Sequence, residues 1–343
     1  MDASLKEYML MQLKNLINID SPTGYTKFVS EYLVKELEDM GYCPYTLNKG
    51  GVICRLNEGE NALALAAHVD TLGAMVKTIK SNGALQVAPL GGLNASNVET
   101  ETARVITRDG KVFDATFQVE NASSHVNKEL STTLRSFDGS LELLLDEEVH
   151  SKTDTEKLGI QTGDIVAVNP RFTITDSGFI KSRFLDDKAS AAVLLALAKA
   201  VKDGKLALFR KVYIIFTVYE EVGHGAAGGL PQDIKDMISV DMGCVGTGLN
   251  CTETQVSICT KDSSGPYNYE LVSELIEAAK SQQADYALDI YPYYGSDVDV
   301  SLKAGYDIRH GLIGPGVYAS HGYERSHVKG LENTFKLLYG YLK

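Results

Sequence analysis

Stretches of helical and of strand character alternate in two parts of this 343-residue chain, and this alternation restricts the possible folds more than any other feature. In residues 1–73 and 174–343, segments with apolar residues at helical spacing alternate with short apolar runs rich in β-branched residues. Such alternation is typical of a sheet with helices on its faces. We therefore predict an α/β domain with a mixed sheet, built from these two discontinuous parts.

Residues 74–173, between those parts, have a different character. They contain short segments of alternating polar and apolar residues, such as Ala103–Val119, and these are separated by Asn-Gly, Asp-Gly and Gly-Asp turns. Short strands with turn signals are typical of a small barrel or sandwich. We predict a small β-barrel domain inserted into the larger α/β domain.

Composition narrows the class of protein. The 45 acidic and 33 basic side chains give a formal net charge of −12 without a basic run, which disfavours nucleic acid and favours metal ions or protonated amines as ligands. The five cysteines form no CxxC pair and no compact secreted spacing, as expected of free thiols in a reducing compartment. The first helical stretch, Ser4–Ile19, carries lysines that a signal peptide core lacks, and no apolar run reaches membrane-spanning length. We expect a cytoplasmic protein with no membrane partner.

Two adjacent carboxylates, Glu220 and Glu221, follow the apolar run Ile214–Tyr219 and precede a glycine-rich stretch. Like charges at this distance repel, and removing either from water is costly, so the pattern indicates a cation between or beside them. A solvated surface pair is a poor explanation after so apolar a strand. The predicted cation requires further ligands from elsewhere in the chain.

Other apolar strands also end in side chains that bind metals. His68 ends one strand and Asp241 another, while Asp186 begins an Ala- and Leu-rich helix and His321 lies in a loop near the C-terminus. Taken singly, Asp186 would be a helix cap and His321 a surface histidine. Because the carboxyl ends of strands line the ligand crevice of an α/β sheet, we expect all these side chains to converge.

Two histidines and several carboxylates suit a pair of first-row divalent ions, namely Zn, Co or Mn, better than Ca or Mg. Glu221 is then a ligand, and Glu220 lies just outside the ligand shell, where it can take a proton from a metal-bound water and return it to a leaving amine. The site residues thus predict metal-assisted hydrolysis, with zinc as the first candidate metal.

Five segments carry a resemblance to a known family. Ala66–Gly73, Leu185–Ala192, Thr217–Ala226, Ser239–Gly243 and Gly314–His327 occur in an order that resembles the M42 metallo-aminopeptidases, relatives of the tetrahedral TET peptidases and the glutamyl aminopeptidases. The resemblance covers nearly the whole chain. It implies an α/β peptidase domain interrupted by a β domain that serves oligomerisation, peptide substrates with a free N-terminus, and a homo-oligomer for which a tetrahedral dodecamer is one form.

Carried over to this chain, the resemblance implies that Asp186 bridges two metal ions. His68 and Asp241 complete one site, Glu221 and His321 the other, and Glu220 is the general base. Asp70, two residues after His68, resembles the carboxylate that orients a ligating imidazole.

For several residues the sequence is compatible with more than one role. His327 could replace His321 as the last ligand. Asp297 and Asp299 lie where the family approaches its substrate, and either could meet the substrate amino group or serve a turn or cap. His224 is expected to be structural.

The M20 peptidases, which include di- and tripeptidases and N-acyl amino acid deacylases, share similar motifs. In their pattern the extra domain follows the later ligand strands, whereas the long insertion here lies between His68 and Asp186. This spacing favours M42. A metal-dependent assembly protein without catalysis is a third reading, disfavoured because every proposed ligand and the base are present.

Overall fold

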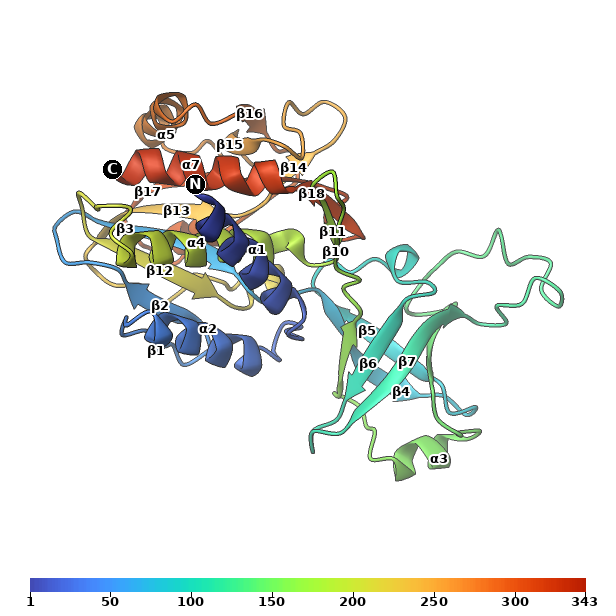
Figure 1. The fold of residues 1–343 in the computed structure, drawn as a ribbon. Coiled ribbons are helices and arrows are strands. Elements are labelled where there is room, and N and C mark those ends of the chain that lie inside the picture. Colours follow the sequence, from blue (N-terminus) through green and yellow to red (C-terminus); the bar gives the residue numbers. More distant parts are fainter. The chain divides into compact units, whose positions relative to one another are not determined.

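The computed structural model describes all 343 residues, which divide into two compact units. Residues 1–70 with 171–343 form an α/β unit, and residues 71–170 form a β unit. Figure 1 shows the elements of both units. This confirms the predicted fold class, a mixed α/β domain with an inserted barrel. No helix combines the length and hydrophobicity that a membrane span requires.

The α/β unit is built on one twelve-stranded mixed sheet, whose longest path runs β1-β2-β12-β3-β13-β17-β18-β11-β10. Strands β12, β3, β13 and the first half of β17 run parallel, whereas β2 is antiparallel to β12, and β15 is antiparallel to β17 but parallel to β16. The strands are β1 Tyr45–Thr46, β2 Val52–Arg55, β3 Ala62–His68, β10 Thr173–Ile174, β11 Phe179–Ser182, β12 Val212–Thr217, β13 Ile234–Val240, β14 Gly243–Val245, β15 Val256–Lys261, β16 Tyr286–Ile290, β17 Arg309–Tyr318 and β18 Glu324–His327.

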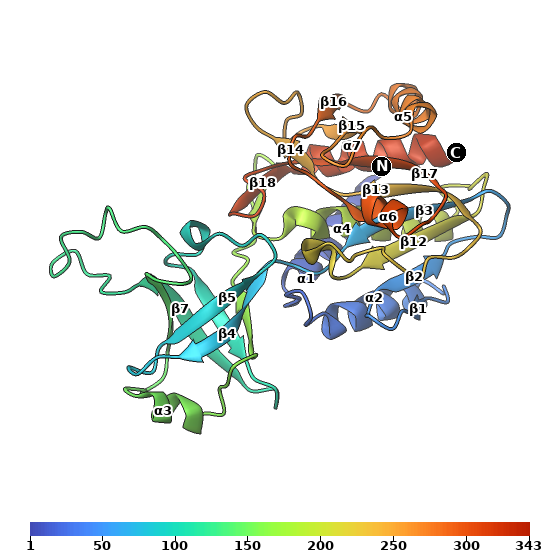
Figure 2. The ribbon, with the colours of Figure 1, turned by 180° about the vertical axis from the view of Figure 1, so that it is seen from behind.

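Helices cover both faces of this sheet. In Figure 1, α1, α4 and α7 lie in front of the strands, and Figure 2 shows α6 in front of the opposite face. Every residue of β3 and β12 is buried, as expected for central parallel strands between two helix layers. The helices are α1 Ala3–Ile17, α2 Lys27–Asp39, α4 Leu185–Lys202, α5 Tyr269–Ser281, α6 Asp297–Lys303 and α7 Val328–Leu342, with a 3₁₀ turn at Glu220–Val222.

The β unit is a closed barrel of six antiparallel strands in the order β4-β5-β8-β7-β6-β9. Alternating strand residues point inward, so that Phe117, Leu143 and Val166 form part of a buried core. Its elements are β4 Gly73–Ile79, β5 Leu85–Leu90, a 3₁₀ turn Ala95–Asn97, β6 Thr102–Ile106, β7 Val112–Val119, β8 Leu141–Leu145, α3 Lys152–Lys157 and β9 Ile165–Val168.

Candidate metal centre

The predicted site residues lie together at the carboxyl ends of the central parallel strands. The neighbours β12, β3, β13 and β17 are parallel, so their carboxyl ends meet there. His68 is the last residue of β3, and Asp241 follows β13 directly. Glu220 and Glu221 lie in the 3₁₀ turn after β12, and His321 lies in the loop after β17.

The start of α4 supplies two more carboxylates near these strand ends. Phe184, before the helix, has a left-handed backbone with φ of 67°, and Asp186 and Asp187 have non-helical dihedrals. The chain therefore enters the helix along an irregular path, and both carboxylates lie in the interior, with exposures of 6% and 0%. Of these two carboxylates, the sequence predicts only Asp186 as a ligand.

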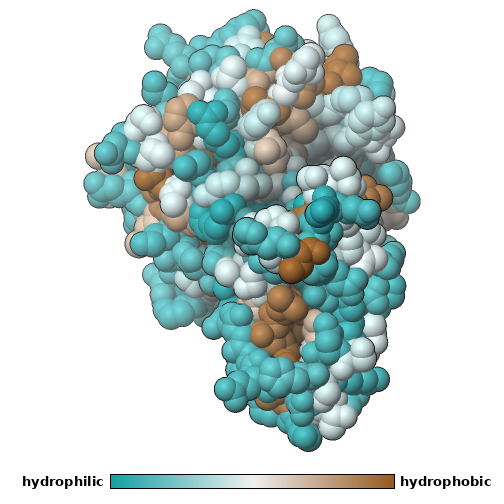
Figure 3. Space-filling model, turned by 90° about the vertical axis from the view of Figure 1, so that its right-hand side faces the viewer, coloured by the Kyte–Doolittle hydropathy of each residue, from teal (hydrophilic) through white to brown (hydrophobic).

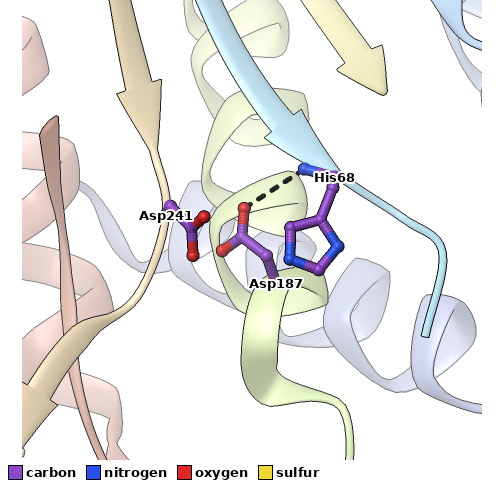
Figure 4. A group of neighbouring side chains, drawn as sticks. All are labelled: His68, Asp187 and Asp241. Atoms are coloured by element: carbon purple, nitrogen blue, oxygen red, sulfur yellow. Dashed lines mark hydrogen bonds between the residues drawn. The ribbon is translucent and has the colours of Figure 1, made fainter. Parts of the chain in front are cut away.

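Two groups of side chains have ligand atoms within 4.8 Å of one another, and both contain His68. One group joins it to Asp186 and Glu221, and the other to Asp187 and Asp241. Figure 4 shows the second group, in which the His68 backbone N–H donates a 3.3 Å hydrogen bond to Asp187. The structure thus brings together His68, Asp186, Glu221 and Asp241.

The loop after β17 places His321 beside the first group. Its Nε2 lies 3.5 Å from Glu221 Oε2 and 3.8 Å from Asp186 Oδ2. His327, the alternative last ligand, is engaged elsewhere, because its Nε2 lies 2.9 Å from the Ser177 carbonyl oxygen and its Nδ1 accepts the Lys329 N–H. At the N-terminus of α7, His327 acts as a helix cap.

Hydrogen bonds determine which His68 nitrogen can bind a metal. Nδ1 lies 3.0 Å from the carbonyl oxygen of Asp70, and since a carbonyl only accepts, Nδ1 carries the proton and donates. In the neutral ring the lone pair is therefore on Nε2, which lies 3.0 Å from Asp186 Oδ1, so Nε2 is the nitrogen that could bind an ion in place of a proton. The expected orienting group was the Asp70 carboxylate, but that oxygen is 3.7 Å from Nδ1.

The Asp70 carboxylate has a different set of partners. Its Oδ1 accepts the Glu220 backbone N–H at 3.1 Å, and its Oδ2 accepts the Thr23 hydroxyl at 2.7 Å. Asp70 thus holds the backbone at Glu220, while its carbonyl oxygen orients His68.

Crowding of carboxylates gives the site a strong preference for positive charge. Burial raises the pKa of Glu221 well above its usual range, and the neighbouring Asp186 raises it further. Burial likewise raises the pKa of Asp241 to about 7, with Asp186 again adding to it. Burial lowers the pKa of His68, but the facing Asp186, Glu220 and Asp241 carboxylates outweigh this and raise it well above its usual range. A mixed imidazole and carboxylate set of this kind fits Zn, Co or Mn.

Glu324 is a residue of the site that the sequence did not reveal. It is 2% exposed, and its two oxygens accept the backbone N–H groups of Asp186 at 3.1 Å and His321 at 3.2 Å. Ser320, also unpredicted, donates its hydroxyl to Asp186 Oδ2 at 3.1 Å. No residue pattern around Glu324 indicates that its side chain is buried.

A cavity of about 810 Å³ opens over these groups. Asp186, Glu220, Glu221, Asp241 and His321 all line it. Its other walls include α6 and the preceding segment, through Tyr294, Ser296, Asp299, Val300 and Lys303.

The two aspartates of α6 have different positions. Asp299 lines the cavity and also accepts the Ser296 N–H at 3.0 Å in a capping box at the start of α6, which is one of the two roles expected for it. Asp297 does not line the cavity and is 2% exposed.

Comparisons with known proteins identify related sequences and related folds. A model of the M42 glutamyl aminopeptidase family matches residues 50–337. The "Putative aminopeptidase YhfE" of Bacillus subtilis is 43% identical over 96% of each chain, and the glutamyl aminopeptidase of Lactococcus lactis is 26% identical over 62% of this chain and 59% of its own. Among solved structures, a TET aminopeptidase from a marine Thaumarchaeota archaeon has a TM-score of 0.87 at 19% identity, over 98% of this chain and 96% of that one. The TET1 peptidase of Pyrococcus horikoshii, which assembles into a tetrahedron or an octahedral shell, has a TM-score of 0.83 at 22% identity, over 97% and 98%.

Proposed function

Since the chain belongs to the M42 peptidase family, we propose that it removes N-terminal residues from peptides by hydrolysis assisted by two divalent metal ions. It is an aminopeptidase, and the family match favours this reading over an M20-type di- or tripeptidase or deacylase. The observation that carries the metal-dependent mechanism is that His68 belongs to two groups of possible ligands, and that three of their carboxylates, Asp186, Glu221 and Asp241, line an open cavity.

Asp186 is the proposed shared ligand, because its two oxygens face opposite sides of the site. Oδ1 lies 3.0 Å from His68 Nε2, and Oδ2 lies 3.8 Å from His321 Nε2. His68 and Asp241 would complete one ion's ligands, and Glu221 and His321 the other's. Asp187 already accepts the His68 N–H, which supports a role in orienting that strand end.

Glu220 is the proposed general base. It lines the cavity beside the ligands but belongs to neither ligand group, and its Oε2 lies 3.9 Å from His68 Nε2. When bound, divalent ions polarise the scissile carbonyl and lower the pKa of the attacking water. Glu220 would accept a proton from the attacking water and donate a proton to the leaving amine. The surplus of carboxylates around the cavity supports binding of a protonated substrate amine.

The test is hydrolysis of aminoacyl chromogenic substrates by chelated protein before and after Zn, Co or Mn is added, with N-acetylated analogues in parallel. We expect cleavage of the free-amine set alone, and only with metal. Cleavage of only the acetylated set would indicate a deacylase, and no cleavage of either set would indicate a non-catalytic protein.

The β barrel is the proposed oligomerisation domain of a cytoplasmic homo-oligomer. The barrel unit exposes large hydrophobic side chains, among them Leu134 at 83% and Val126 at 70%. Figure 3 shows a face on which hydrophobic residues gather in places within a mostly hydrophilic surface. Exposed apolar groups of this kind support contact between protein chains.

A further inference from the structure

The loop after β12 is held by a single buried carboxylate. Asp297, the first residue of α6, accepts the Thr217 hydroxyl through Oδ2 at 2.5 Å and the Ala226 backbone N–H through Oδ1 at 2.7 Å. Thr217 ends β12, and Ala226 ends the stretch that carries Glu220 and Glu221. One side chain therefore joins the two ends of the segment that bears the proposed base.

The close contact between Asp297 and the loop requires glycine at position 225. A Cβ atom at Gly225 would lie 1.8 Å from Asp297 Oδ1 and 3.3 Å from the Glu220 Cα. Real Cβ atoms do not approach other atoms as closely as 1.8 Å, so the loop can pack on the carboxylate only with glycine at this position. The same glycine lies between Asp297 and the backbone of Glu220.

A side chain of opposite charge holds the carbonyl groups of the same loop. Lys49, half-buried in the turn between β1 and β2, donates through Nζ to the carbonyl oxygens of His224 and Gly225. Asp297 thus accepts a hydrogen bond from one N–H group of the loop, and Lys49 donates hydrogen bonds to two of its C=O groups. Three backbone polar groups of the loop therefore have hydrogen-bond partners in Asp297 and Lys49, two ionisable side chains that come from different parts of the fold.

We propose that Asp297 is a positioning residue, which holds the loop after β12 so that Glu220 faces the cavity. The inference rests on the proposed function of Glu220 as the general base. Asp297 does not line the cavity, so it does not contact the substrate. Its contribution to turnover is made through the loop backbone, whose displacement by about 1 Å would cost on the order of 100-fold in rate.

Two substitutions of Asp297 separate geometry from charge. Asp297→Ala removes both acceptors, whereas Asp297→Asn keeps an oxygen for the Ala226 N–H and an amide beside the Thr217 hydroxyl. We expect Asp297→Ala to lower kcat about 100-fold with little change in KM or in bound metal at saturation, and Asp297→Asn to lose less than about 10-fold. Amide hydrogen exchange of the 218–226 segment should be faster in the Ala variant and near normal in the Asn variant.

Asp289 provides a matched control. It is a buried carboxylate, 3% exposed, that also holds a loop by its backbone, accepting the N–H groups of Asn250 at 2.7 Å and Cys251 at 3.1 Å. Neither it nor that loop lines the cavity. Asp289→Ala should lower Tm and leave kcat and exchange of the 218–226 segment unchanged.

Three results would overturn the proposal. These are an unchanged kcat in Asp297→Ala, an equal loss of kcat in Asp289→Ala, and a loss of metal in proportion to kcat, which would connect Asp297 to the ligand Glu221 instead. If Asp297→Ala does not fold, Thr217→Val removes one of the two contacts and should give a smaller change in the same direction. Should the wild-type protein cleave no peptide, hydrogen exchange alone still tests whether Asp297 orders the loop.

Discussion

At the scale of single residues, Glu220 and Glu221 are chain neighbours with separate proposed roles. Glu220→Gln should lower kcat by about 100- to 10,000-fold, because the amide cannot accept a proton, and should leave bound metal unchanged. Glu221→Gln, its matched control, should lose both turnover and metal, since it removes a ligand. Elemental analysis beside steady-state kinetics checks both. Loss of metal in Glu220→Gln would show that the base and the ligand have been assigned the wrong way round.

Residues at strand ends were predictable from sequence, and residues placed by irregular backbone were not. His68, Glu221 and Asp241 each follow an apolar run, and the sheet brings such ends together. Glu324, the first residue of β18, contacts Asp186 across 138 positions of sequence, so only the folded chain shows that its carboxylate is buried. The position of Asp187 was not predictable for a related reason, because the non-helical start of α4 decides which way its side chain points.

At the scale of elements, the longer helices and most apolar strands follow from periodicity, but the short helix α6 and the strand β17 do not. Its sequence, Arg309–Tyr318, contains three glycines and a proline, which weaken a strand pattern. The packing explains the glycines, since a Cβ at Gly314 would lie 1.4 Å from the Asp241 carbonyl oxygen and one at Gly316 2.1 Å from that of Thr252. β17 pairs with four other strands, so contacts made only in the fold override its weak local preference.

A charge cluster links β13 to β17 and yields a prediction for stability. Asp236 is 2% exposed and pairs with Arg210 at 2.6 Å and with Arg309 at 2.7 Å. Asp236→Asn should lower the free energy of unfolding by about 3 kcal/mol at neutral pH, because it leaves the buried Arg210 guanidinium without a counter-charge. Urea unfolding of both proteins measures this difference.

The same cluster predicts a pH dependence. Burial raises the pKa of Asp236, but hydrogen bonds from the two arginines outweigh it and hold the pKa below its usual value. A lowered folded-state pKa contributes stability that is complete above the unfolded value, about 3.9, and is lost as pH falls through the folded value. The difference between wild type and Asp236→Asn should therefore shrink in acid. Asp233→Asn, at the more exposed pair with Lys211, should have a much smaller effect at every pH, and equal effects would contradict the buried-pair explanation.

At the scale of the whole molecule, the inserted barrel has a closed sheet and a core of its own, so its exposed hydrophobic side chains are not needed to complete its fold. If they mediate self-association, Leu134→Glu should lower the molar mass measured by light scattering, because a charge in an apolar interface must be desolvated without a partner. Ile290→Glu, at a 57% exposed position of the α/β unit, is the matched control and should leave the mass unchanged. A wild-type monomer, or an equal fall in mass in both variants, would refute association through the barrel.

Because the proposed ligands and base all come from the α/β unit, a dissociated Leu134→Glu protein should still bind metal and cleave small aminoacyl substrates.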